Sequence, residues 1–149
     1  MLYFARMARE AQLQLLSRYE NIELAEQVLA ELGRDGDVER ETLYWVGMAL
    51  REALANAIKH GNKLNPDKRV FVEMTVVPHE EVRIAIEDEG EGFDPARLTD
   101  PTDTDNLLRA SGRGVFYMKS FMDTVEFRTS PRGGTRIELS KRLVARRPA

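Results

Sequence analysis

The first half of the chain carries its hydrophobic residues at helical spacing. Between residues 21 and 32 the apolar positions recur every three or four residues, which is typical of an amphipathic helix: Ile22, Ala25, Val28, Leu29 and Leu32. Gly33 is expected to end this helix, and the GRDGD stretch to form the turn after it. The same period over residues 39–59 predicts the longest helix, and a short alternation over residues 12–17 favours a first strand.

In the second half of the chain the hydrophobic period changes from 3.6 residues to two. Apolar and polar residues alternate over 70–76 and again over 82–87, with a short turn between them, so these segments predict a β-hairpin. Residues 125–129 and 135–139 alternate in the same way around the SPRGG stretch, and they predict a second hairpin at the end of the chain.

The order of these elements indicates an α+β fold. Residues 97–111 are rich in Asp, Thr and Pro and predict a long loop, and a helix over 115–122 follows it. Helices come first and antiparallel strands dominate later, which favours one layer of helices on one sheet. We expect a single domain with its core over about 12–143 and an N-terminal extension of unknown role over 1–11.

Composition narrows the classes of protein to which the chain can belong. Among 149 residues, 22 Lys and Arg against 25 Asp and Glu give a net charge of −3, without the basic excess usual for nucleic-acid binding. The absence of cysteine excludes disulfides, thiolate metal sites and a cysteine nucleophile. No apolar run approaches the length of about 20 residues that spans a bilayer, and no signal peptide is recognisable, so we expect a cytoplasmic protein.

The longest predicted helix carries a polar row opposite its hydrophobic side. Glu52, Asn56 and His60 follow one another at one-turn intervals, flanked by apolar residues: Trp45, Met48 and Ala49. A carboxylate among apolar neighbours is suited to act as a base, or to hold a metal ion together with an amide oxygen. The alternatives are a solvated glutamate, an asparagine at the helix end and a histidine that caps the helix.

A glycine-rich acidic segment, DEGEGFD over residues 88–94, follows the second strand of the first hairpin directly. Gly90 and Gly92 lack side chains where the backbone leaves the sheet, which permits positive φ or the close approach of a flat ligand. Asp88 would accept a hydrogen bond from an exocyclic amine. The alternatives are a plain acidic turn or a calcium loop, although the segment lacks the twelve-residue ligand pattern and flanking helices of an EF-hand.

The segment before the last predicted helix, SGRG over residues 111–114, suits an anion. Gly112 and Gly114 would let backbone N–H groups point at a phosphate at the helix N-terminus, and Arg113 would add a charge-assisted contact. The loop 97–111 just upstream would serve as a lid over a nucleotide. The alternative is ordinary capping of the helix by glycine.

The remaining polar candidates favour no hydrolase. The GGT segment over 133–135, taken alone, is better explained by a hairpin turn that needs glycine than by a binding role. His79 lies in the predicted turn of the first hairpin and is expected to face solvent. Neither His79 nor His60 has the neighbouring serine and carboxylate of a catalytic triad.

Taken in order, four segments resemble the N, G1, G2 and G3 boxes of the GHKL nucleotide-binding superfamily, which includes gyrase, Hsp90, histidine kinases and MutL. They are EALANAIKHGN (52–62), DEGEGFD (88–94), GRG (112–114) and GGT (133–135). Within that superfamily, the ExxxNAxxHGN and GRGVFxMKSFMD patterns resemble the anti-sigma-factor serine kinases of bacteria, from about residue 17 to residue 143. The resemblance implies the Bergerat fold, a two-layer α+β sandwich with a mixed, mostly antiparallel sheet covered on one face by helices.

The resemblance also implies roles for individual residues. Glu52 would deprotonate the attacking hydroxyl, Asn56 would hold Mg²⁺ against the phosphates, and His60 would lie in the nucleotide site. Asp88 would recognise the adenine amino group with Thr135 alongside it. The remaining residues shape the purine slot or hold the phosphates: Gly90, Gly92, Gly112, Arg113 and Gly114.

The function implied by this resemblance is that of an anti-sigma factor with serine kinase activity that uses ATP and Mg²⁺. It would bind a sigma factor, phosphorylate a STAS-type antagonist and form a homodimer, with no direct contact to nucleic acid or membrane. We expect neither the second domain of gyrase, Hsp90 or MutL nor the phosphoacceptor helix of a complete histidine kinase. Two alternatives remain: a nucleotide-binding regulatory module without catalysis, and a detached histidine-kinase-like ATPase domain.

Overall fold

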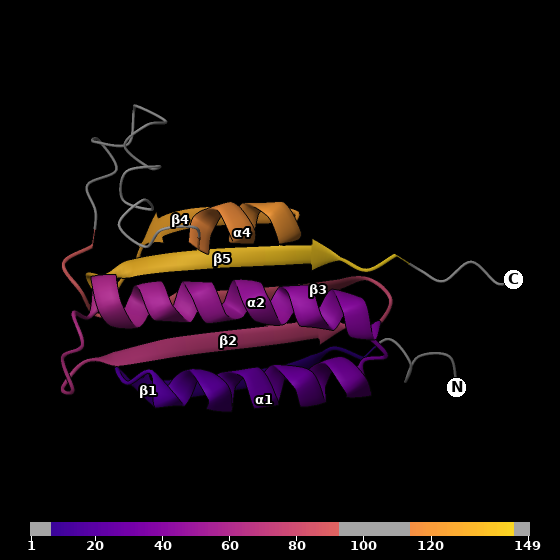
Figure 1. Ribbon diagram of the computed structural model, residues 1–149, viewed down its shortest axis with the longest axis horizontal. Helices are drawn as coiled ribbons and strands as arrows, with labels where there is room; N and C mark the ends of the chain where they lie inside the picture. Colours follow the sequence, from indigo (N-terminus) through magenta and orange to yellow (C-terminus); the bar gives the residue numbers. More distant parts are fainter. Residues whose placement is uncertain (1–6, 93–113, 145–149) are drawn as a thin grey trace, which may run out of the picture.

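The computed structural model describes residues 7–92 and 114–144 (Figure 1). The elements follow one another as β1 (Arg9–Leu16), α1 (Glu20–Asp35), α2 (Arg40–Asn56), the π-helical turn η2 (Ala57–Gly61), β2 (Arg69–Val77), β3 (Glu81–Glu87), α4 (Gly114–Phe121), β4 (Thr124–Thr129) and β5 (Thr135–Arg142). Every predicted helix, strand and hairpin is therefore present, with bounds that differ by a few residues.

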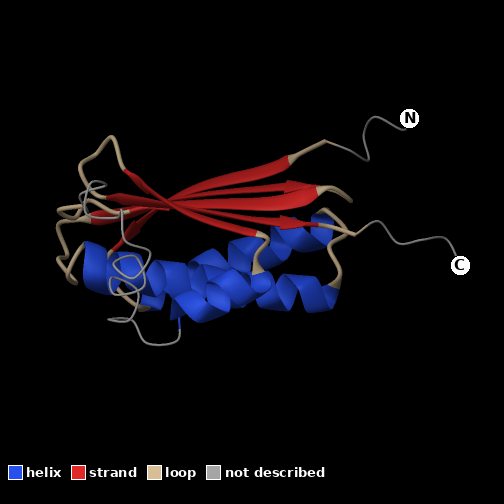
Figure 2. Cartoon of the chain, turned by 90° about the horizontal axis from the view of Figure 1, so that it is seen from above, coloured by secondary structure: helices blue, strands red, loops and turns tan. Residues whose placement is uncertain are grey.

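The strands form one sheet in the order β1-β2-β3-β5-β4, and the helices cover one face of it (Figure 2). The α+β prediction is confirmed. All four pairings between the described strands are antiparallel, so the sheet is antiparallel and the expected mixed sheet is wrong in that detail. Short turns within each hairpin favour this arrangement, because a parallel pair would need a long crossover connection.

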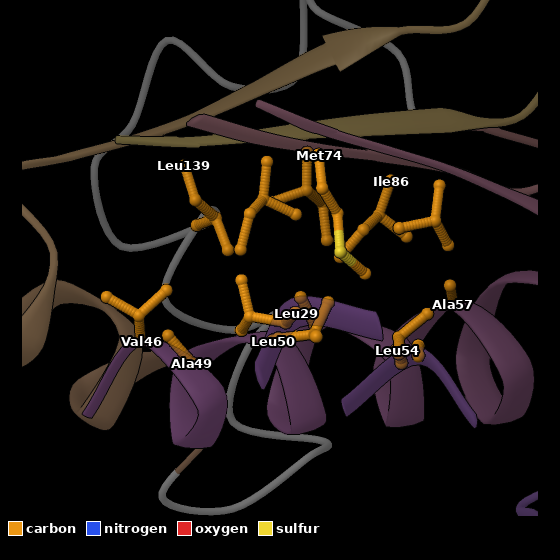
Figure 3. Packing of buried hydrophobic residues seen from close by; sticks show 14 of the residues in the cluster. Leu29, Val46, Ala49, Leu50, Leu54, Ala57, Met74, Ile86 and Leu139 are labelled. Atoms are coloured by element: carbon orange, nitrogen blue, oxygen red, sulfur yellow. The ribbon is translucent and has the colours of Figure 1, made fainter. Parts of the chain in front are cut away.

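The hydrophobic core lies between the sheet and the helices (Figure 3). Alternate residues of β2 and β3 point into it, with Val72 opposite Ile86 and Met74 opposite Ile84 in the register. From the other side, α2 contributes the apolar face that its 3.6-residue period predicts: Val46, Leu50, Leu54 and, in η2, Ala57 and Ile58. Both sequence periods thus place their hydrophobic residues in the same layer.

Two predicted boundaries are wrong. Helix α1 runs through Gly33 to Asp35 and is capped by Gly36 instead. Gly33 serves packing, because a Cβ atom there would lie 2.4 Å from Cδ1 of Leu43 on α2. At the N-terminus, β1 begins at Arg9, inside the segment expected to precede the core, where it pairs with Val76.

The C-terminal end of α2 widens into the π-helical turn η2, in which the backbone N–H of Asn62 donates to the carbonyl of Ala57 at 2.8 Å. Lys63 and Leu64 follow with left-handed φ angles of 52° and 58°. Such turns are rare and occur frequently at functional sites. In the described parts of the chain, no helix is long and apolar enough to cross a membrane.

Candidate functional site

Asp88 lies at the end of β3 and is almost completely buried, with 4% of its surface exposed. Its Oδ1 accepts hydrogen bonds from the backbone N–H groups of Gly90, at 2.9 Å, and Thr135, at 3.0 Å. The backbone N–H of Asp88 in turn donates to the carbonyl of Thr135 at 3.0 Å. The structure therefore brings together two predicted site residues that are 47 positions apart in the chain.

Glycines surround the Asp88 carboxylate where a larger residue would collide. A Cβ atom on Gly61 would lie 2.2 Å from Oδ2 of Asp88, and one on Gly134 would lie 2.1 Å from its backbone oxygen. A Cβ on Gly90 would lie 2.2 Å from the carbonyl oxygen of Gly61, and Gly92 has a φ of 73°. Gly92 therefore has the predicted positive φ, whereas the close approach at Gly90 is between backbone segments; the approach of a flat ligand stays a prediction.

Three residues of this site have no role assigned from the sequence: Gly61, Asn62 and Gly134. Each lies inside a motif that is recognisable in the sequence, within two residues of a residue with an assigned role. The buried Asn62 side chain bonds to the backbone of Glu89, in the turn that follows Asp88. Their positions inside the motifs were the sequence signal that could have identified these residues. Only the contacts with Asp88 and its turn explain what the residues do.

Burial raises the pKa of Asp88 above its ordinary value, and the hydrogen bonds from Thr135 and Gly90 oppose this effect only partly. Between the ordinary pKa of the unfolded carboxyl and the raised pKa of the folded one, the folded chain binds more protons. The stability of the fold should therefore fall as the pH rises through this window and stay lower above it. The carboxylate form of Asp88 reduces stability, as expected of a group retained for binding.

This cost can be measured with Asp88→Asn, which keeps an oxygen acceptor but does not titrate. At neutral pH we expect the variant to unfold at a higher temperature than the wild type, because no buried charge remains. The difference should shrink as the pH falls through the ordinary carboxyl range, and thermal unfolding followed by circular dichroism at several pH values measures it. A variant less stable than the wild type at neutral pH would contradict this account.

The predicted row on α2 is only partly sheltered. Glu52 and Asn56 are half-buried, whereas His60 is exposed in η2. The row is flanked on one side by α4, because the Trp45 ring stacks on Phe121 with centroids 4.3 Å apart and Ala49 is completely buried. Glu52 and Asn56 are thus partly sheltered from solvent, whereas the His60 end of the row is an ordinary solvated position.

The Asn56 side chain is an unsatisfied polar group. Its Nδ2 is buried without a hydrogen-bond partner among the described residues. Buried amides normally have partners, and exceptions concentrate where a ligand or ion completes the bonding. Because a rotation of the amide exchanges its nitrogen and oxygen, the same position can present an oxygen to a hard cation. The residue therefore fits the magnesium role that the resemblance implies.

The predicted phosphate-binding residues fall at the edge of what the structure describes. Gly114 begins α4, which lies beside α2 in Figure 1. Gly112, Arg113 and the loop 97–111, expected to form a lid, lie outside the described residues, as do the last two positions of DEGEGFD. Their roles stay predictions.

The close contact at Gly134 supplies a test of the site's packing. We expect Gly134→Ala to destabilise the fold by about 1–3 kcal/mol and to weaken ligand binding at Asp88, because the new methyl group has rigid backbone in its way. The matched control is Gly47→Ala in α2, where a Cβ meets nothing within 4 Å; it should stabilise the helix by about 0.5–1 kcal/mol. Denaturant titration of both variants measures these free energies of unfolding, and equal effects would contradict the assigned role of Gly134.

Comparison with known proteins agrees with this geometry. Residues 15–141 match the model of the histidine kinase-like ATPase domain family. The chain is 34% identical over 140 residues to an anti-sigma F factor of Heyndrickxia coagulans, covering 92% of this chain and 95% of that protein. It is 32% identical over 139 residues to the anti-sigma F factor of Bacillus subtilis, with 92% and 94% covered.

Solved structures show the same fold at low sequence identity. The RsbU and RsbW domains of a Mycobacterium tuberculosis protein superpose with a TM-score of 0.66 and 16% identity, over 91% of this chain and 32% of that one. The mycobacterial sensor histidine kinase MprB superposes with a TM-score of 0.53 and 16% identity, over 90% and 97%. The resemblance that the four motifs indicate is thereby confirmed, and the chain belongs to the histidine kinase-like ATPase domain family, with anti-sigma F factors as relatives along nearly its whole length.

Proposed function

We propose that this chain is an anti-sigma factor with protein serine kinase activity that depends on ATP and Mg²⁺. It binds a sigma factor and phosphorylates a small STAS-type antagonist, and it acts as a homodimer. The observation that carries the proposal is the pairing of the half-buried Glu52 and Asn56 on α2 with the buried Asp88 carboxylate, which lies against the far end of η2. The relatives named anti-sigma F factor support the regulatory part.

The Asp88 site suits a purine with an exocyclic amine. Both described hydrogen bonds to the carboxylate reach Oδ1, while Oδ2 lies against the Cα of Gly61. The carboxylate accepts a hydrogen bond from the exocyclic amine of adenine, and Thr135 lies beside the carboxylate. Glycine at positions 61, 90 and 134 lets these backbone segments pack directly on Asp88 and its turn. These features favour ATP as the nucleotide.

Asn56, toward the other end of the site, would hold the Mg²⁺ that accompanies the nucleotide. When bound, the metal neutralises the charge that develops on the transferred phosphoryl group. Arg113 and the backbone N–H groups of Gly112 and Gly114 bind the phosphates at the start of α4. Phosphoryl transfer needs chiefly such positioning and charge stabilisation.

Glu52 accepts the proton of the attacking serine hydroxyl. It lies one turn before Asn56 on the same helix, so the base and the metal ligand are held by a single rigid element.

The direct test is transfer of radioactive phosphate from ATP, with Mg²⁺, to a purified STAS-type antagonist. We expect acid-stable phosphoserine on the antagonist and none without Mg²⁺. If the chain binds ATP but transfers no phosphate to any such antagonist, it is a regulatory nucleotide-binding module and not a kinase. An acid-labile phosphoprotein would indicate a histidine-kinase-like domain. Light scattering of the same preparation tests the homodimer.

A further inference from the structure

Asn62, directly after η2, is the centre of a buried hydrogen-bond network; 1% of its surface is exposed. Its Nδ2 donates to Oγ of Ser17 and to the carbonyl of Arg69, both at 2.9 Å. Its Oδ1 accepts the backbone N–H of Glu89 at 2.7 Å, and Ser17 Oγ donates to the carbonyl of Lys68 at 2.6 Å. One side chain thus joins the end of β1, the start of β2 and the turn after β3.

The network contacts the Asp88 site through two segments, the end of η2 and the turn after β3. Asn62 follows Gly61, whose Cα lies against Oδ2 of Asp88, and its side chain holds Glu89, which follows Asp88. Gly90, the next residue, packs against the carbonyl of Gly61. A displacement of Asn62 would therefore separate η2 from the turn that presents the carboxylate.

The backbone directly after Asn62 is strained. A role of Asn62 in stability alone does not explain why this strain is kept. Lys63 and Leu64 both have left-handed φ angles, and the turn before them is π-helical. Left-handed backbone at residues other than glycine is unfavourable, and it persists only where surrounding contacts hold it. The three side-chain bonds of Asn62 are contacts of this kind.

We propose that Asn62 is a positioning residue for the purine pocket. It holds the turn with Asp88 and Glu89 at a set distance from the end of the helix that carries Glu52 and Asn56. The purine and the phosphates of one nucleotide can then reach their binding residues at the same time. The inference rests on the proposed function, which supplies the nucleotide, and extends it to how adenine is distinguished from other bases.

The test compares two substitutions in the same network. Asn62→Ala removes the bond to Glu89 and should weaken ATP binding by about 10- to 100-fold, because the backbone N–H of Glu89 loses its buried acceptor and the turn that carries Asp88 is no longer held. It should also lower the preference for ATP over GTP. Ser17→Ala, the control, removes a buried partner on the side away from Asp88 and should change ATP affinity by less than about twofold. Calorimetric titration with both nucleotides, on samples shown to be folded by circular dichroism, measures these affinities.

A second variant covers the case in which Asn62→Ala does not fold. Asn62→Asp keeps an acceptor for Glu89 but turns a carboxylate oxygen toward the carbonyl of Arg69. Burial raises the pKa of the introduced carboxyl, and its protonated form can donate again. The charged residues on the segments that adjoin or bond to this position are Arg18, Lys63, Lys68, Arg69, Asp88 and Glu89. Relative to the wild type at each pH, ATP affinity should be reduced at about pH 8 and partly restored at about pH 5.

The outcomes separate this inference from the function on which it rests. If the wild type binds ATP but Asn62→Ala and Ser17→Ala lower affinity equally, or Asn62→Asp shows no recovery relative to the wild type in acid, Asn62 is a structural residue and the inference is overturned alone. If the wild type binds neither ATP nor GTP, the proposed function and the inference are overturned together.

Discussion

Replacing Glu52 with glutamine is expected to lower phosphate transfer to the antagonist by about 10²- to 10⁴-fold, the usual contribution of a general base. Glutamine has nearly the same shape and polarity but cannot accept the serine proton at neutral pH. Because the side chain is half-buried on a helix whose core face it does not join, ATP affinity and stability should change little. The loss should therefore appear in kcat and not in nucleotide affinity.

Single-turnover transfer from radioactive ATP, with calorimetry for ATP affinity, makes this distinction. Glu31→Gln is the matched control, since Glu31 is an exposed carboxylate on α1 whose loss should leave transfer unchanged. A Glu52→Gln variant that transfers phosphate at the wild-type rate would remove Glu52 from the mechanism. Loss of ATP binding together with transfer would assign it to nucleotide binding instead.

Asp88→Asn is expected to weaken ATP binding by about 10- to 200-fold, because an unmatched buried hydrogen bond to a charged group costs about 1.5–3 kcal/mol. The amide oxygen can still accept the bonds from Gly90 and Thr135, so the turn should keep its structure. Its nitrogen, however, presents a donor where the adenine amine needs an acceptor.

The nucleotide preference of the Asp88→Asn variant supplies a second test of base recognition. Inosine triphosphate carries an acceptor in place of the adenine amine, so the variant should lose less affinity for it than for ATP. Titration calorimetry with both nucleotides in the presence of Mg²⁺ measures the two ratios. Equal affinity of wild type and variant for ATP would show that Asp88 does not recognise the base. Thermal unfolding of the variant should at the same time show the increased stability expected from removing a buried charge.

The positions of the predicted elements were accessible from the sequence because they depend on local burial. A residue on α2 or β2 faces the core according to a period of 3.6 or two, whatever its partner is. Val46 and Leu50 on α2 and Val72 and Met74 on β2 therefore reach the core as predicted. Asp88 was recognisable as a candidate because an acidic residue follows a hydrophobic strand at once.

The errors share one physical cause, which is that they concern packing against distant parts of the chain. Gly33 has the identity of a helix terminator, but the proximity of Leu43 makes it a packing glycine inside α1. The widening of α2 into η2 likewise has no local signal, since AIKHG is compatible with an ordinary helix. Local preference yields to tertiary contacts in both cases.

By itself, the sequence determined the types and order of the elements, the α+β class and the four motifs, since each depends on the spacing of neighbouring residues. Only the tertiary structure decided that Thr135 and Gly134 meet Asp88 and that Asn62 joins β1, β2 and the turn after β3. These contacts depend on the strand order, in which β5 lies beside β3, and on close approaches of backbone from segments far apart in the chain.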